Sequence, residues 1–201
     1  MNGRKYFDVG KMVRLAVLVA ILLLLAYTPL GYLKVGAVSI TFLTIPVAVA
    51  AIIVGPGAGA FLGGVFGLTS FLQCFGADPF GAALLAINPI LTFIMCMVPR
   101  ILAGWLPGLV FRALHRRYLD TIGAFVASLC VSVFNTIFFV SALILFFFGT
   151  EPMRALGDSV LAVIAVLVTT NALIEAIACT VVAGGVSRAL LHFVPLKPVK
   201  Q

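Results

Sequence analysis

The stretch from Asn88 to Arg112 constrains this chain most, because it is an apolar run long enough to cross a bilayer with an arginine in its interior. Arg100 lies twelve residues before Arg112, which is about 18 Å along a helix that rises 1.5 Å per residue. The hydrocarbon core is about 30 Å thick, so Arg100 falls near the midplane. An arginine there costs about 2.5–3.5 kcal/mol on insertion scales. Arg100 therefore needs a partner, a wet cavity or a ligand.

The composition of the rest of the chain is also that of a membrane protein. Of its 201 residues, 63% are hydrophobic and 9% are charged, whereas soluble chains carry about 25% charged residues. A chain of this length leaves no room for a soluble catalytic domain beside its spans. We therefore expect one six-helix membrane domain over residues 1–201, an all-α integral membrane protein.

Apolar runs separated by loops predict six transmembrane helices. Lysines and arginines gather at the N-terminus, in the loop after the fourth span and in the C-terminal tail, which predicts that both termini are cytoplasmic. A loop from Gly76 to Ala86 is expected between the third and fourth spans. The six expected spans are Met12–Thr28, Ala37–Val54, Ala58–Phe75, Asn88–Arg112, Leu119–Phe148 and Ser159–Leu191.

Two rows of small residues predict close contacts between helices. Ala16 and Ala20 form an AxxxA pair in the first span, and Gly59, Gly63 and Gly67 form a GxxxGxxxG row in the third. Small residues four apart line one helix face and let another helix approach closely. Packing inside the bundle is one interpretation of both rows, and contact with a second protein is the other.

Polar residues inside the spans are few and fall at similar depths. Asn171 and Glu175 are four apart, so they share a helix face, and Ser128, Ser132 and Asn135 form a stripe on the fifth span. Thr92, Cys96 and Arg100 step by four along the fourth span, where Pro99 leaves the Met95 carbonyl without its helical donor. These depths predict a polar cluster in the outer half of the membrane. It is either a buried Arg100–Glu175 ion pair or a small-solute site open to the outside.

Several chemistries are absent from the sequence. It has no GxxxxGK[ST] phosphate loop, so the chain does not hydrolyse ATP itself. It has no HExxH or GxSxG motif and no set of nucleophile, base and orienting group. The four cysteines, Cys74, Cys96, Cys130 and Cys179, lie in apolar runs and predict small buried side chains. We expect no enzyme activity, no cofactor, no metal site and no nucleic-acid partner.

The order of these features resembles the substrate-binding S components of energy-coupling factor (ECF) vitamin transporters. The likeness covers nearly the whole chain and includes the alanine pair of the first helix. Ile45–Phe71 (IPVAVAAIIVGPGAGAFLGGVFGLTSF) and Val98–Gly108 (VPRILAGWLPG) are similar to the pantothenate-type branch.

The resemblance implies a function, partners and a site. The chain would capture a vitamin, with pantothenate expected, at the outer face of a bacterial plasma membrane. A transmembrane T protein would dock on Ala16 and Ala20, and two ATPase subunits would drive uptake. Alternatives are an S component for folate, thiamine or pyridoxine, a membrane enzyme or assembly factor that uses Glu175, and a stand-alone carrier. The expected ligand-binding side chains are Arg100, Asn135, Asn171, Glu175, Asn88, Thr92 and Gln73.

Overall fold

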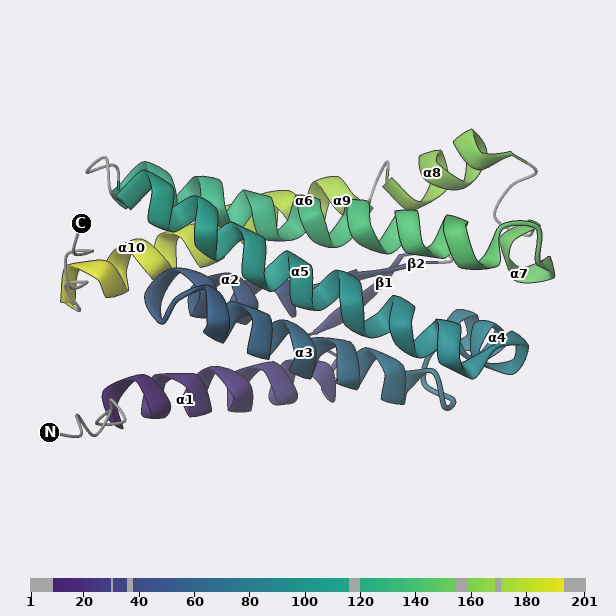
Figure 1. Cartoon of the computed structure of the whole chain (residues 1–201), viewed down its shortest axis with the longest axis horizontal. Helices are drawn as coiled ribbons and strands as arrows, with labels where there is room; N and C mark the ends of the chain where they lie inside the picture. The colour runs from purple at the N-terminus through teal and green to yellow at the C-terminus, as the bar shows by residue number, and fades with distance from the viewer. Residues whose placement is uncertain are drawn as a thin grey trace, which may run out of the picture.

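Long helices lie side by side along one axis in the computed structural model (Figure 1), which describes residues 9–29, 31–35, 38–115, 120–154, 159–168 and 171–193. The four longest are α1 (Val9–Ala26), α3 (Pro56–Gln73), α5 (Pro89–His115) and α6 (Asp120–Phe147). The start of α1 and the end of α10 (Gly184–Phe193) lie at the same end of the bundle. The short helices α4 (Pro79–Ile87) and α7 (Glu151–Arg154) lie at the opposite end.

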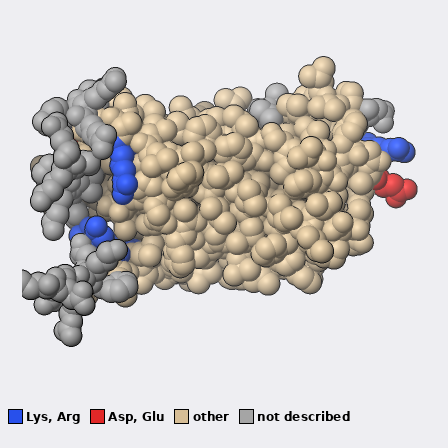
Figure 2. Space-filling model, viewed as in Figure 1, with Lys and Arg blue, Asp and Glu red and all other residues tan. Residues whose placement is uncertain are grey.

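Four helical segments are long and apolar enough to cross a membrane by length and composition. They are Val9–Ala26, Pro89–His115, Asp120–Phe147 and Ala172–Phe193. On the face shown in Figure 2, charged side chains lie near the two ends of the molecule, and the long middle is uncharged. An uncharged belt between two charged ends is what a bilayer requires of a membrane protein.

The second expected span is shorter than predicted. We expected a helix over Ala37–Val54, but α2 covers only Thr44–Ile53. The residues before it form an antiparallel hairpin of β1 (Tyr32–Val35) and β2 (Val38–Thr41), with Tyr32 opposite Thr41. The Val-Ser-Ile-Thr run of β2 is rich in the β-branched residues that favour strands.

The sixth expected span is divided. Instead of one helix over Ser159–Leu191, α8 covers Val160–Val168 and α9 covers Asn171–Ala178. A π-helical turn, η1 (Cys179–Ala183), then joins α9 directly to α10. Only the part from Ala172 onward is long enough to count as a spanning segment.

The expected loop between the third and fourth spans contains the helix α4. Asp78 accepts a hydrogen bond from the Phe80 backbone nitrogen at 3.2 Å, and Pro79 is the first helical residue. An aspartate cap followed by proline is a common helix start. The loop prediction was therefore wrong for Pro79–Ala86.

The glycine row of α3 packs inside the bundle, against α5. A methyl group on Gly59 would overlap the Gly104 carbonyl oxygen, and one on Gly63 would overlap the carbonyl oxygen of Arg100. The two backbones can approach this closely only because α3 carries no side chains there. This contact fixes the position of the Arg100 backbone.

The helix α1 packs on the bundle along one face only. Leu22 and Ala26 are buried there, whereas Ala16 and Ala20 are exposed on the other side, next to the exposed Val17. The alanine pair is therefore exposed on the surface of the described part of this chain.

Candidate functional site

Arg100 is buried between helices, with 9% of its surface exposed. Its Nη1 donates a hydrogen bond to the Met95 carbonyl oxygen at 2.8 Å. That carbonyl is available because Pro99, four residues later, has no backbone N–H to donate to it. The proline thus supplies an acceptor for a guanidinium that would otherwise be costly to bury.

Two aromatic rings flank the Arg100 guanidinium. Its central carbon lies 4.3 Å from the ring centroid of Phe139 on α6 and 5.5 Å from that of Phe66 on α3. A cation within about 6 Å of a ring centroid is attracted by the ring's quadrupole. The Nε atom of Arg100 is buried without a hydrogen-bond partner among the described residues. The site therefore holds a buried cation whose Nε–H group makes no hydrogen bond to the described residues.

Asn135 and Glu175 form the second polar contact of the cluster. The Nδ2 of Asn135 on α6 donates to Oε1 of Glu175 on α9 at 3.3 Å, and both residues are buried. The amide nitrogen of Asn135 is thus the donor to Glu175, and the amide oxygen takes no part in this bond. The Oδ1 of Asn135 is left buried and unpartnered within the described structure. It is an acceptor that meets no donor from the described residues.

Two buried hydroxyl groups lie beside Glu175. They belong to Thr44, the first residue of α2, and Ser132, one turn before Asn135 on α6. Neither hydroxyl oxygen has a hydrogen-bond partner in the described part of the chain. Ser132 belonged to the predicted stripe, but Thr44 was missed because we expected it inside the second span. The signal that could have found it is a hydroxyl-bearing residue inside an apolar run, the same signal that pointed to Ser128 and Ser132.

Arg100 and Glu175 do not form the ion pair that the sequence left open. Within the described residues, the ion pair found joins His115 to Asp120, between α5 and α6. The polar cluster thus has a donor part at Arg100 and an acceptor part at Asn135 and Glu175. It has no nucleophile activated by a base, and it suits hydrogen-bonded capture of a solute that carries an anionic group and hydroxyl or amide groups.

Three other predicted residues use their polar atoms within the protein. Asn88 caps α5, with its Oδ1 accepting from the backbone nitrogens of Ile90 and Leu91 at 3.1 and 3.2 Å. Thr92 donates to the Asn88 carbonyl at 2.9 Å, and Gln73 donates to the Ala26 carbonyl at 2.9 Å. Asn171 begins α9, and its side chain lies outside the described part of the structure. A ligand role for these four residues stays a prediction.

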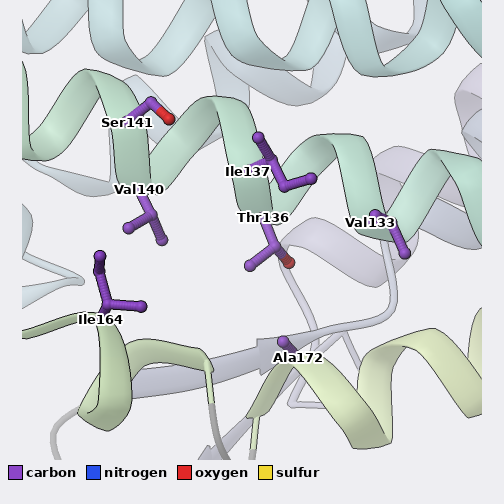
Figure 3. A pocket seen from close by; sticks show the side chains of 7 residues that line it. All are labelled: Val133, Thr136, Ile137, Val140, Ser141, Ile164 and Ala172. Atoms are coloured by element: carbon purple, nitrogen blue, oxygen red, sulfur yellow. The ribbon is translucent and has the colours of Figure 1, made fainter. Parts of the chain in front are cut away.

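A groove of about 310 Å³ lies along an adjacent part of α6 (Figure 3). Val133, Ile137 and Val140 line it from α6, with Ile164 of α8 and Ala172 of α9 across from them. Thr136 also lines the groove and lies four residues after Ser132, so the groove adjoins the face of α6 that carries Ser132 and Asn135. The described lining of the groove includes none of the predicted ligand-binding side chains.

Comparison with known proteins identifies a family. The model of the family described as "ECF transporter, substrate-specific component" matches residues 10–187. The Pantothenate transporter PanT of Leuconostoc mesenteroides subsp. mesenteroides is 36% identical over 111 residues, which cover 55% of this chain and 52% of that protein. The Pantothenic acid transporter PanT of Lactococcus lactis subsp. cremoris is 30% identical over 159 residues, 75% of this chain and 76% of that protein.

The matched region includes every element of the polar cluster, from Thr44 on α2 to Glu175 on α9. Family membership confirms the resemblance and sets aside the alternative of a membrane enzyme, because the family consists of transporter components. This membrane protein belongs to the family of substrate-specific components of ECF transporters.

Proposed function

We propose that this chain is the high-affinity substrate-binding subunit of an ECF-type importer for pantothenate. The two relatives named above carry pantothenate in their names. The single structural observation that supports the choice is the buried Arg100, whose Nε has no partner among the described residues. Pantothenate carries one carboxylate, and a guanidinium can grip a carboxylate with two charge-assisted hydrogen bonds.

The polarity of the cluster supports one orientation of the ligand. Its carboxylate would bind at Arg100, and its hydroxyl and amide N–H groups would donate to Asn135 and Glu175. The buried hydroxyls of Thr44 and Ser132 can donate or accept, so they would complete the contacts of the ligand's hydroxyl and carbonyl groups. The four polar atoms of the cluster that lack a partner among the described residues would then each gain one.

The proposed topology is one six-span domain over residues 1–201 with both termini cytoplasmic. The crossing segments would be α1, α2 with its preceding hairpin, α3, α5, α6, and the last segment from α8 to α10. The gathering of lysines and arginines at the N-terminus, the α5–α6 connection and the C-terminal tail supports this orientation. The protein would be a multi-pass protein of a bacterial plasma membrane.

The proposed partners are the T protein and two ATPase subunits of an ECF module. The exposed Ala16–Ala20 face of α1 would dock on the T protein, and ATP hydrolysis on the separate subunits would drive uptake. The exposure of both alanines on a helix packed along its other face supports this assignment. Small residues would let the partner helix approach closely.

The test of the proposed function is the ligand itself. The full chain is purified in mild detergent, and mass spectrometry identifies the small molecules that co-purify. We expect pantothenate, and we expect calorimetric titration of the emptied protein to give tight binding without chemical conversion of the ligand. Recovery of folate, thiamine or pyridoxine in its place would assign the chain to another vitamin. Absence of tight pantothenate binding would contradict the proposal.

A further inference from the structure

We propose that Phe139 is a positioning residue, which holds the Arg100 guanidinium in the orientation that binds the ligand's carboxylate. Phe66 on α3 would support the guanidinium as a second, more distant ring. This inference rests on the proposed function, and it concerns how one site distinguishes a carboxylate from a neutral group. It starts from the geometry around Arg100, where one hydrogen bond and two rings act on the same group.

The hydrogen bond and the nearer ring constrain the guanidinium in different ways. The bond from Nη1 to the Met95 carbonyl fixes one corner of the planar group. The group can still rotate about that corner. The Phe139 ring, at 4.3 Å, limits this rotation because it attracts the cation and occupies the space beside it. One bond and one ring together hold the guanidinium more firmly than either alone.

An aromatic neighbour stabilises the charge without using the donors that a ligand needs. The five N–H groups of a guanidinium form a rigid fork that matches a carboxylate, and the group also stacks on aromatic faces. A carboxylate neighbour such as Glu175 would occupy these N–H groups and compete with the ligand. In the structure Glu175 is bound to Asn135 instead, and the Nε of Arg100 stays unpartnered among the described residues. The phenyl ring therefore keeps a buried cation ready to bind an anion.

Phe139 also links the two parts of the site. It lies four residues after Asn135 on α6, so the two side chains share a helix face. The same face thus carries the side chain that orients Arg100 and the amide that is bonded to Glu175. The spacing between the anionic end and the hydroxyl end of a ligand would be set by four residues of this helix, about 6 Å.

The test compares two ligands that differ at one group. Pantothenate carries the carboxylate, and panthenol carries a neutral hydroxyl group in its place. Dissociation constants for both are measured by titration on the full-length protein and on the Phe139→Leu variant. We expect Phe139→Leu to weaken pantothenate binding about tenfold and to change panthenol binding less than twofold, because the lost ring acts only through the cation. The Phe139→Tyr variant, which keeps a ring face, should restore most of the preference for pantothenate.

A neighbouring ring supplies the matched control. Phe138 is partly buried on the same helix and packs against Phe134, with centroids 5.7 Å apart. Phe138→Leu should leave the ratio of the two dissociation constants unchanged. If Phe139→Leu does not fold, Phe139→Met replaces it, because methionine fills a similar volume without an aromatic face.

Each remaining outcome counts against the inference. Equal weakening of both ligands by Phe139→Leu would show that the ring only shapes the pocket. Unchanged binding of both would show that Arg100 needs no positioning by the ring. If the wild-type protein binds neither compound, the proposed function fails and the inference that depends on it fails as well. If the wild-type protein binds pantothenate and Phe139→Leu shows the same preference between the two ligands, the inference is wrong but the proposed function stands.

Discussion

The side-chain Nδ2 of Asn135 on α6 donates a hydrogen bond to Oε1 of Glu175 on α9, at 3.3 Å. The bond has two consequences for a ligand. It provides the buried Glu175 with a donor, and it turns the Asn135 carbonyl oxygen toward a place where no described protein group donates to it. The acceptor that a ligand hydroxyl would meet is therefore set by Glu175 on another helix.

The first prediction concerns this pair. Asn135→Ala and Glu175→Gln should each weaken pantothenate binding about tenfold, the size expected for one lost hydrogen bond to a buried or charged group. The double variant should lose less than the sum of the two, because either single change already misplaces the other group. Titration of the four proteins gives the coupling. Ser128→Ala is the control, since its buried hydroxyl bonds only to the Ala124 carbonyl of its own helix. If the two losses of binding free energy simply add, Asn135 and Glu175 act independently and the predicted coupling is wrong.

The second prediction concerns Arg100. Arg100→Gln should fold and bind pantothenate about 100-fold more weakly, because a bidentate charge-assisted contact is lost. The affinity of Arg100→Lys for pantothenate should lie between that of the wild type and that of Arg100→Gln, since lysine keeps the charge without the fork of donors. Arg188→Gln is the control, because Arg188 is exposed on α10 at the other end of the last segment. Wild-type affinity in Arg100→Gln would make the arginine structural.

The third prediction concerns the seam between α3 and α5. Gly63→Ala should destabilise the protein by about 1–3 kcal/mol, the usual cost of overpacking. It should also weaken ligand binding, because the new methyl group overlaps the Arg100 carbonyl oxygen and must displace that backbone. Thermal unfolding in detergent and titration measure the two effects. Gly57→Ala is the matched control, since a methyl group there meets no atom within 4 Å. If Gly63→Ala and Gly57→Ala have the same stability and affinity, the close contact between the α3 and α5 backbones at Gly63 is contradicted.

The fourth prediction concerns the exposed face of α1. The double change Ala16→Leu with Ala20→Leu should leave pantothenate binding by the isolated chain intact, because lipid accepts a leucine as readily as an alanine. It should abolish uptake and co-purification with the T protein, because two leucines are a steric wedge against a closely packed partner. Ala165→Leu, at an exposed alanine of α8, should change neither. Lost ligand binding with the complex retained would contradict the docking role.

One helix start was predictable and another was missed, although the same local chemistry makes both. The fourth span was expected to begin at Asn88, and the Asn88 side chain caps α5. Asp78 followed by Pro79 starts α4 in the same way, but that segment was expected to be a loop. The hairpin before α2 was not predictable in the same way. A short apolar run such as Val38–Thr41 fits a strand or a buried helix equally well, and only pairing with Tyr32–Val35 decides between them.

Members of the buried polar cluster were predictable where a residue is costly to bury. Arg100 and Glu175 stood out because charged groups inside a membrane need partners, and the structure places both in the buried cluster. Phe139 gave no such signal, since phenylalanine is ordinary in an apolar helix. Its contact with the guanidinium comes from the packing of α6 against α5, which brings one ring among many next to Arg100. The absence of an Arg100–Glu175 ion pair likewise depends on distances that no spacing rule supplies.

The π-helical turn of Cys179–Ala183 keeps the last segment in phase with the bundle. Residues four apart drift by about 40° per step around a helix of 3.6 residues per turn, yet the described structure buries the four-step row of Glu175, Cys179, Ala183 and Ser187 along its whole length. A π turn holds more residues per turn and takes up part of that drift. Deleting one residue there would restore an unbroken α-helix and rotate Glu175 away from Asn135, even though every side chain of the cluster would still be present.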